Sequence, residues 1–391
     1  MHALGLRCTA CAWVGERKLT YECPVCGHPL EVFYDYSRVN PAEVERALKG
    51  FRTMWDFAEL LPVKNRENMI TMTEGGTPLI RSRLSLGCRA YWKDETRNPT
   101  LSFKDRPNSV GISVAKELGF HEVSIASTGN GGASLSAYAA RAGMLCHVCI
   151  PSATPGGKVT QQRYHGADIT LCDGDYAASF SENKKRSERN QWVDMTSTYR
   201  NPYTMEGDKT IGYEIFAQLG NVVPDWVAVP LGAGAMLTGI YKGFCELKEL
   251  GFCDRLPKMI GVQAMGCAPI VEAWEKRTDH VDAWKKCDTI CGAIADPLTG
   301  YEKDGMCTVK SINRSGGVGV KVSDPDSVEA IRNLARTDGL FVEPASATVE
   351  AAIRQLTGSG VIRPDEIAVG IITAHGLKDA QELASIIGKE A

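Results

Sequence analysis

The 391-residue chain is long enough for two domains with separate cores, and its formal net charge of −3 provides no electrostatic reason to expect nucleic acid or an anionic membrane as a partner. Its composition, with 43% hydrophobic residues, 23% charged residues and 39 glycines, is typical of a soluble α/β protein with many tight turns. No apolar run reaches the roughly 18–20 residues of a membrane span, and the N-terminus lacks a secretory signal pattern, so we expect a cytoplasmic protein without a membrane partner.

The first recognisable element is a group of four cysteines in the pattern C-x2-C-x11-C-x2-C, formed by Cys8, Cys11, Cys23 and Cys26. Two such pairs can place four thiolates tetrahedrally around one zinc ion, and a site with no open position is structural. We therefore predict a zinc-ribbon-like segment over residues 1–33. The alternative, which stays open, is that the four cysteines are reduced and no longer bind metal. The segment has too few basic residues for a convincing nucleic-acid surface.

The other ten of the fourteen cysteines do not form such an array. Most lie singly in apolar, strand-like surroundings, as Cys146 and Cys149 do. We therefore predict buried free thiols in a reducing cytosol.

Residues 31–72 have the composition of a helical linker region, with a helix over 41–48 and Asn40 as its N-cap. Beyond it, strand and helix patterns alternate, which predicts an α/β fold of two domains with parallel-type sheets covered by helices. The charge run 182–189 is interpreted as a solvated helix face. The predicted strands are 123–126, 146–150, 226–229, 259–262 and 367–372, and the predicted helices include 108–118, 135–141, 237–242, 327–337 and 381–387.

A lysine stands just ahead of one of these helices, in the stretch Asn98-Pro-Thr-Leu-Ser-Phe-Lys-Asp-Arg-Pro107. Pro107 fits the first helical turn, and Gly119 is a plausible C-terminal stop. Lys104 would then lie near the positive end of the helix dipole, which together with burial is expected to lower its pKa and free the amine to attack a carbonyl. The alternative is a lysine that is exposed to solvent and has no catalytic role.

Two glycine-rich turns connect predicted strands to helices. Gly232-Ala-Gly-Ala235 follows the strand 226–229, and its glycines would let backbone N–H groups close on a phosphate at a helix N-terminus. Ser127-Thr-Gly-Asn-Gly-Gly-Ala-Ser134 follows the strand 123–126. The structural alternatives are tight strand–helix packing for the first turn and a left-handed turn residue for Asn130 in the second.

Three further segments complete a series along the chain: Thr73-Glu-Gly-Gly-Thr-Pro-Leu79, Glu343-Pro-Ala-Ser-Ala347 and Thr373-Ala-His-Gly-Leu-Lys-Asp379. In this order, from about Thr73 to Asp379, the set resembles the fold-type II pyridoxal-phosphate enzymes of the tryptophan synthase β-like family. Within that family it is most similar to the threonine synthases. Some threonine synthase-like proteins also carry an N-terminal extension such as the cysteine segment.

The resemblance implies pyridoxal 5′-phosphate as cofactor and gives each matching residue a role. Lys104 would form the Schiff base and, once displaced by substrate, carry protons as the catalytic residue. His375 is left outside these assignments, because a lone histidine after a strand is more often structural. The implied binding residues are Gly232, Ala233, Gly234 and Ala235 for the cofactor phosphate, Asn130 for the 3′ oxygen, Thr373 facing the ring nitrogen, and Ser127, Thr128 and Gly129 for the substrate carboxylate.

The chain departs from the family pattern at several positions. The lysine motif of the family reads N-P-T-G-S-F-K-D-R-G, so Leu101 and Pro107 replace glycines, and Leu101 is expected to narrow the pocket. The family motif N-S-x-N-P-x-R-x-E-G-Q-K-T corresponds to residues 198–210, where Thr204 replaces the arginine that helps to hold the substrate phosphate. Arg200, four residues earlier, is a candidate substitute.

Three functions therefore remain open. The first is a carbon–oxygen lyase of the threonine synthase type, which converts O-phosphohomoserine and water to threonine and phosphate. The second is a serine/threonine dehydratase-like or β/γ-replacement enzyme acting on another substituted amino acid, because of Thr204. The third is a non-catalytic ligand-binding protein. The resemblance also implies a small amino-acid substrate and a homodimer.

The resemblance further implies a domain plan. Residues 34–105 would form linker helices and the first part of a large cofactor domain, residues 106–205 a small mobile domain, and residues 206–391 the rest of the large domain.

Overall fold

The computed structural model describes residues 2–127, 129–152, 154, 156–174, 176–196 and 198–388. The chain divides into two compact units, of which unit 1 comprises Met1–Gly76 and Asn98–Thr210, and unit 2 comprises Thr77–Arg97 and Ile211–Ala391. Residues 34–76, expected in part to belong to the large domain, lie in unit 1. The mobility expected of residues 106–205 stays a prediction.

Unit 1 begins with a three-stranded antiparallel sheet in the order β2-β1-β3, formed by β1 (Ala3–Cys8), β2 (Val14–Glu16) and β3 (Leu30–Tyr34). Helix α1 (Pro41–Gly50) follows, and the Asn40 side chain accepts a hydrogen bond from the Ala42 N–H over 3.1 Å, as the predicted N-cap should. The rest of the expected linker consists of short 3-10 helices: η1 (Tyr36–Arg38), η2 (Met54–Leu60) and η3 (Arg66–Asn68).

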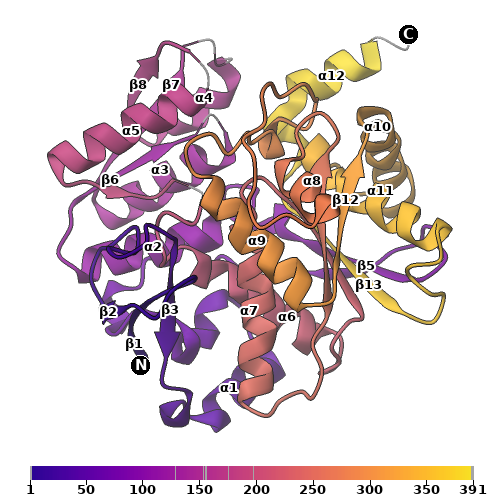
Figure 1. Ribbon diagram of the computed structural model, residues 1–391, viewed down its shortest axis with the longest axis horizontal. Coiled ribbons are helices and arrows are strands. Elements are labelled where there is room, and N and C mark those ends of the chain that lie inside the picture. Colours follow the sequence, from indigo (N-terminus) through magenta and orange to yellow (C-terminus); the bar gives the residue numbers. More distant parts are fainter. Residues whose placement is uncertain are drawn as a thin grey trace. The chain divides into compact units, whose positions relative to one another are not determined.

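The second sheet of unit 1 is parallel and has the order β8-β7-β6-β9. Its strands are β6 (Glu122–Ala126), β7 (Leu145–Pro151), β8 (Asp168–Cys172) and β9 (Val193–Asp194). Its core combines strand residues such as Val123, Ile125 and Val148 with Leu135 and Tyr138 from helix α3. The helices of this part are α2 (Asp105–Glu117), α3 (Asn130–Ala142), α4 (Gly156–Tyr164), α5 (Tyr176–Asn190) and α6 (Met205–Gln218), the last of which continues into unit 2 (Figure 1).

Unit 2 is built on a six-stranded sheet in the order β12-β11-β10-β13-β5-β4. All its neighbouring strands are parallel except the edge pair β4–β5, which is antiparallel. The strands are β4 (Leu79–Arg81), β5 (Arg89–Asp94), β10 (Trp226–Pro230), β11 (Lys258–Ala264), β12 (Val318–Val322) and β13 (Ile367–Ile372).

Helices cover both faces of this sheet. Alternate strand residues such as Trp92, Ala228 and Ile260 share a buried core with residues of α10 and α11. On the opposite face a Cβ on Gly261 would lie 2.7 Å from Ile312 of α9, which shows how closely that helix packs. The helices and short helical turns are α7 (Ala235–Glu249), α8 (Pro269–Lys276), η5 (Gly292–Ile294), α9 (Glu302–Arg314), α10 (Asp324–Asn333), the π-helical turn η6 (Leu334–Asp338), α11 (Pro344–Gly358), η4 (Glu95–Arg97), η7 (Gly376–Asp379) and α12 (Ala380–Gly388) (Figure 1).

The α/β fold class is confirmed, and each predicted strand lies within an observed one. The helix predicted over 327–337 ends earlier, because α10 stops at Asn333 and continues as the π-helical turn η6. Cys146 and Cys149 are buried free thiols, as predicted. Across the described residues, no helix combines the length and the apolar character that crossing a membrane requires.

Candidate functional site

Lys104 stands at the N-cap position of α2, directly before the first helical residue Asp105. Pro107 lies in the first turn, and Gly119 follows the helix with φ +83°, so both end signals are confirmed. The Lys104 side chain is half-buried, and its Nζ lies 4.4 Å from the centre of the Phe103 ring. A charged ammonium at this distance is stabilised by the ring.

The loop that carries Lys104 is closed on itself by the neighbouring carboxylate. Asp105 accepts hydrogen bonds from the Thr100 N–H over 2.7 Å and from the Thr100 hydroxyl over 2.6 Å. Burial raises the pKa of the Asp105 carboxyl to about 6, although hydrogen bonds from Ser134 and Thr100 favour its charged form. The two hydrogen bonds between Thr100 and Asp105 connect the two ends of the loop that contains Lys104 and so hold its conformation.

Leu101, which replaces the family glycine in this loop, has φ +65°. A leucine in the left-handed region is strained by about 1–2 kcal/mol, whereas glycine would not be. Thr73, in the first motif of the series, is also left-handed, with φ +69°. Strained residues of this kind concentrate at functional sites.

The lysine loop is tied to the second glycine-rich turn inside unit 1. Ser134 of α3 donates to Asp105 over 2.7 Å, and the Asn108 side chain lies 3.4 Å from the Gly131 carbonyl oxygen. Asn130 is the first residue of α3 and is not left-handed, so the turn-residue alternative does not hold. Lys104 and Asn130 therefore belong to one connected substructure.

The predicted carboxylate clamp precedes α3. Gly129 is the N-cap, and its N–H lies 3.5 Å from the Ser127 hydroxyl oxygen. Thr128 lies outside the described residues. The N–H groups at the start of this 13-residue helix are the donors that a substrate carboxylate requires.

A buried carboxylate that the sequence reasoning did not single out supports the same region. Glu74 is fully buried and accepts hydrogen bonds from the Trp55 indole over 2.8 Å, from Ser109 of α2 over 2.6 Å and from Tyr138 of α3 over 2.6 Å. It thereby joins the first motif to the helices that follow Lys104 and Asn130. In the sequence, only the position of Glu74 within the Thr73–Leu79 motif could have pointed to this role.

In unit 2, the glycine-rich turn after β10, which is predicted to bind the cofactor phosphate, leads directly into α7. Gly234 is the N-cap of α7 with φ +92°, and a Cβ there would lie 2.3 Å from the Thr308 hydroxyl oxygen. Both the backbone conformation and the space therefore require glycine. The N-cap glycine has no side chain with which to cap the first N–H groups of α7. Gly232 and Ala233 precede this cap, and Ala235 is the first helical residue.

Thr373 lies at the carboxyl end of β13, the strand next to β10, so it shares one sheet edge with the Gly232–Ala235 turn. Its hydroxyl is 2.6 Å from the hydroxyl of Ser346, which in turn accepts from the Ala374 N–H over 2.9 Å. Ser346, at the start of α11, lies in the motif Glu343–Ala347, but the sequence reasoning assigned it no role.

His375 serves as the N-cap of η7 and accepts from the Leu377 N–H, as its structural interpretation predicts.

The residues fit pyridoxal phosphate on two grounds. Ser102, two residues before Lys104, is fully buried, and among the described residues its hydroxyl has no hydrogen-bond partner. A buried hydroxyl without a partner is costly, so a polar ligand group beside the lysine loop would stabilise it. The glycine cradle before α7 offers N–H donors suited to a phosphate.

The segment expected to hold a substrate phosphate contains no suitable cation at the two candidate positions. Thr204 is buried, donates to the Asn201 carbonyl over 2.8 Å and packs its methyl group towards Gly111 of α2. Arg200 is bound to carboxylates: its Nε is 2.6 Å from Asp194, and its terminal nitrogens lie 3.3 Å from Glu22 and 3.2 Å from Glu188. Arg200 is therefore engaged in three ion pairs inside unit 1, which disfavours it as a substitute for the missing arginine, and its role as a candidate stays a prediction.

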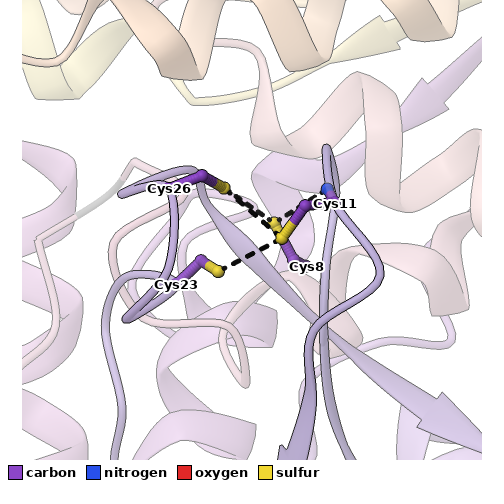
Figure 2. A group of neighbouring side chains, drawn as sticks. All are labelled: Cys8, Cys11, Cys23 and Cys26. Atoms are coloured by element: carbon purple, nitrogen blue, oxygen red, sulfur yellow. Dashed lines mark hydrogen bonds between the residues drawn. The ribbon is translucent and has the colours of Figure 1, made fainter.

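The four N-terminal cysteines converge, as Figure 2 shows. Sulfur–sulfur distances are 3.4 Å between Cys8 and Cys26 and 3.6 Å between Cys11 and both Cys23 and Cys26, with all four within 4.8 Å of one another. Zinc–sulfur bonds of about 2.3 Å in a tetrahedron place sulfurs roughly 3.8 Å apart. The N–H groups of Ala10 and Cys11 both donate to the Cys8 sulfur over 3.3 Å, as in a metal-binding turn.

Comparison with known proteins agrees with this geometry. The model of the family described as pyridoxal-phosphate dependent enzyme matches residues 70–374, so the chain belongs to that family. Among its curated relatives, the threonine synthase of Methanocaldococcus jannaschii is 40% identical over 380 residues, covering 95% of this chain and 92% of the relative. The threonine synthase of Methanosarcina acetivorans is 38% identical and covers 97% and 94%.

A solved structure supports the fold. An L-serine ammonia-lyase from Rhizomucor miehei superimposes with a TM-score of 0.69 at 20% sequence identity, covering 81% of this chain and 99% of that chain. The chain thus has the fold-type II architecture of pyridoxal-phosphate enzymes.

Proposed function

We propose that this protein is a threonine synthase, which converts O-phosphohomoserine and water to threonine and phosphate. The observation that carries the proposal is the 40% identity to a threonine synthase over 95% of the chain, well beyond the 70–374 family match. This match extends over more of the chain than the cofactor-domain model does, so part of the similarity lies outside that domain.

The residues would divide the work as follows. Lys104 holds the cofactor covalently and, when substrate displaces it, its amine takes and returns protons at the α and β carbons. The N–H groups of the Gly232–Ala235 turn hold the cofactor phosphate, and the Asn130 amide binds the 3′ oxygen. Thr373, already paired with Ser346, faces the ring nitrogen. Ser127, Thr128 and Gly129 hold the substrate carboxylate.

Bound at this site, pyridoxal phosphate supplies the electron sink that makes those carbon-bound protons acidic. A hydroxyl such as that of Thr373, unlike a carboxylate, does not keep the ring nitrogen protonated. A threonine at this position therefore makes the cofactor a weaker electron sink, which favours elimination and replacement over transamination.

The direct test is incubation of the purified, cofactor-loaded protein with O-phosphohomoserine, with phosphate and threonine both quantified. We expect equimolar release of the two products and no turnover by Lys104→Ala. Phosphate release without threonine would contradict the proposal, as would an inert wild-type enzyme that demonstrably holds the cofactor.

The contacts of Thr204 and Arg200 favour a second candidate function. Without a guanidinium at position 204, and with Arg200 bound to Asp194, the substrate phosphate lacks the charge-assisted contact described for the family. A dehydratase-like or β/γ-replacement enzyme needs no such contact. Production of a 2-oxo acid and ammonia from serine or threonine, with no phosphate release from O-phosphohomoserine, would establish this alternative.

We also propose that Cys8, Cys11, Cys23 and Cys26 bind a structural zinc ion, which their sulfur spacing supports. A cytoplasmic location and a homodimer remain proposals that rest on the sequence and on the family resemblance. Size-exclusion chromatography with light scattering measures the oligomeric state directly.

A further inference from the structure

Two cysteines of unit 2, outside the proposed cofactor residues, lie very close together. The Sγ atoms of Cys267 and Cys287 are 2.8 Å apart, closer than the 3.4 Å between Cys8 and Cys26 in the metal-binding cluster. A disulfide bond needs about 2.05 Å, so the two sulfurs would have to approach by only about 0.75 Å, the difference between 2.8 Å and that length.

The backbone holds this pair in register. Cys267 stands in the turn after β11, where its N–H donates to the Ala264 carbonyl over 2.9 Å. The Asp288 N–H donates to the Gly266 carbonyl over 3.2 Å, and a Cβ on Gly266 would lie only 1.8 Å from the Asp288 carbonyl oxygen. Backbone contact on one side of each cysteine therefore places the two sulfurs opposite each other.

The two thiols differ in exposure. Cys267 is fully buried, whereas Cys287 is half-buried on a loop in which Lys285, Lys286 and Asp288 are exposed. The hydrogen bond with Cys287, followed by burial, raises the pKa of the Cys267 thiol. A small solute would thus reach Cys287 first, with Cys267 behind it as the resolving group.

We propose that Cys267 and Cys287 are a reversible disulfide site that reacts with small-molecule disulfides of the glutathione type. The Cys287 thiolate attacks the disulfide, forming a mixed disulfide and releasing one thiolate. Cys267 then attacks the Cys287 sulfur, which expels the second thiolate. Two protein thiols are oxidised, one small disulfide is reduced to two thiols, and the two cysteine protons end on the released thiolates.

The site lies beside the turn proposed to hold the cofactor phosphate. Asp296 is close enough to Cys267 to affect the pKa of its thiol, and the Asp296 side chain would lie 3.5 Å from a Cβ on Gly232. Asp296 also accepts from the Leu298 N–H over 3.0 Å and from the Tyr301 hydroxyl over 2.6 Å. Closing the disulfide changes one contact of this anchored segment, so we infer weaker cofactor binding in the oxidised form. This second part rests on the proposed function of the Gly232–Ala235 turn.

The test equilibrates the cofactor-loaded protein in glutathione buffers of graded ratio, blocks the remaining thiols and maps tryptic peptides. The relevant peptides are 259–276, with Cys267, and 287–303, with Cys287 and Cys291. We expect these two peptides to be joined through Cys287, two fewer free thiols, and full reversal by dithiothreitol. Fragment ions distinguish Cys287 from Cys291 within the second peptide.

The matched variants are Cys287→Ser, which should abolish the link, and Cys291→Ser in the same loop, which should preserve it. Absence of the joined peptide at every ratio would overturn the disulfide, and so would a Cys287–Cys291 bond or a mixed disulfide that never resolves. Cofactor affinity of the oxidised and reduced forms is read from absorbance titration, where we expect at least a threefold loss on oxidation. An unchanged affinity would overturn the link to the phosphate turn. Neither readout requires O-phosphohomoserine turnover, so failure here is distinct from failure of the proposed reaction.

Discussion

At the scale of single residues, the surroundings of Lys104 depend on buried carboxyl groups that neutral side chains hold by hydrogen bonds. Asp105 is held by Thr100 and Ser134, and Glu74 by Trp55, Ser109 and Tyr138. Such carboxylates fix positions because each lost partner leaves a buried charge without compensation.

The pH dependence of Asp105 is measurable. Its folded pKa of about 6 lies above the ordinary aspartate value of 3.8, so the folded state binds the carboxyl proton more tightly than the unfolded state does. The stability it contributes is complete below about pH 4 and is lost as the pH rises through about 6, by about 3 kcal/mol for this shift. Asp105→Asn, which stays neutral, should remove this slope.

Urea unfolding of the cofactor-free protein between pH 4 and pH 6.5 measures the effect. The control is the wild-type protein under identical conditions. A slope that persists unchanged in the variant would show that another group titrates in this range.

A second residue-scale prediction concerns Arg200. Arg200→Met leaves the buried Asp194 without its guanidinium partner, so we expect the free energy of unfolding to fall by about 3–5 kcal/mol. Because this guanidinium is engaged in ion pairs, the KM for O-phosphohomoserine of the protein that remains folded should change less than threefold. A rise of tenfold or more in KM, with stability unaffected, would mean that Arg200 reaches the substrate after all.

At the scale of elements, the proposed phosphate-binding residues depend on how a strand turns into a helix. Gly234 at the start of α7 and Gly251 just after its end both have positive φ, +92° and +79°. Only at Gly234 would a side chain also clash, because a Cβ there lies 2.3 Å from the Thr308 hydroxyl oxygen. Apart from its chain neighbours, no atom of the described residues lies within 4 Å of a Cβ on Gly251.

These two glycines form a matched pair for substitution. Gly251→Ala should cost about 1 kcal/mol of stability from backbone strain alone and leave cofactor affinity unchanged. Gly234→Ala should distort the turn and weaken pyridoxal phosphate binding at least tenfold. Fluorescence titration of the cofactor and thermal unfolding of both variants provide the comparison. Equal cofactor affinities would argue against the phosphate role of this turn.

At the scale of the whole molecule, the cysteine-rich segment is part of the core of unit 1. Leu6 and Val32 of its sheet share one buried cluster with Val110 and Val114 of α2, the helix that follows Lys104. Tyr34 of β3 also donates to Glu206 of α6 over 2.5 Å. Unfolding of the cysteine-rich segment should therefore destabilise α2, the helix that positions Lys104.

Zinc removal tests this connection. If the proposed zinc is bound, Cys11→Ser, at a half-buried cysteine of the cluster, should lower the zinc content from one equivalent to a small fraction and reduce the melting temperature by several degrees. Cys88→Ser, a half-buried cysteine outside the cluster, is the control and should retain zinc. Elemental analysis and calorimetry are the measurements. Full stability of a zinc-free protein would mean that the four sulfurs need no metal.

Much of the candidate site could be predicted because its signals are local. The Asn40 cap, the Pro107 and Gly119 helix signals, and the glycine before α7 each act within a few residues of the feature they define. In the region after residue 72, strands β4, β5, β8, β9 and β12 were missed, because each is short or has charged or polar residues that interrupt an apolar run. Sequence periodicity carries little signal in such strands.

The sequence by itself determined the α/β class, the order of the motifs and the identity of the lysine, because spacing and residue type are read along the chain. Only the tertiary structure decided that Arg200 belongs to Asp194, that Ser346 pairs with Thr373, and that Cys267 meets Cys287. These partners lie 6, 27 and 20 residues apart. Their contacts follow from side-chain direction and from how helices pack on the sheets, which no local pattern encodes.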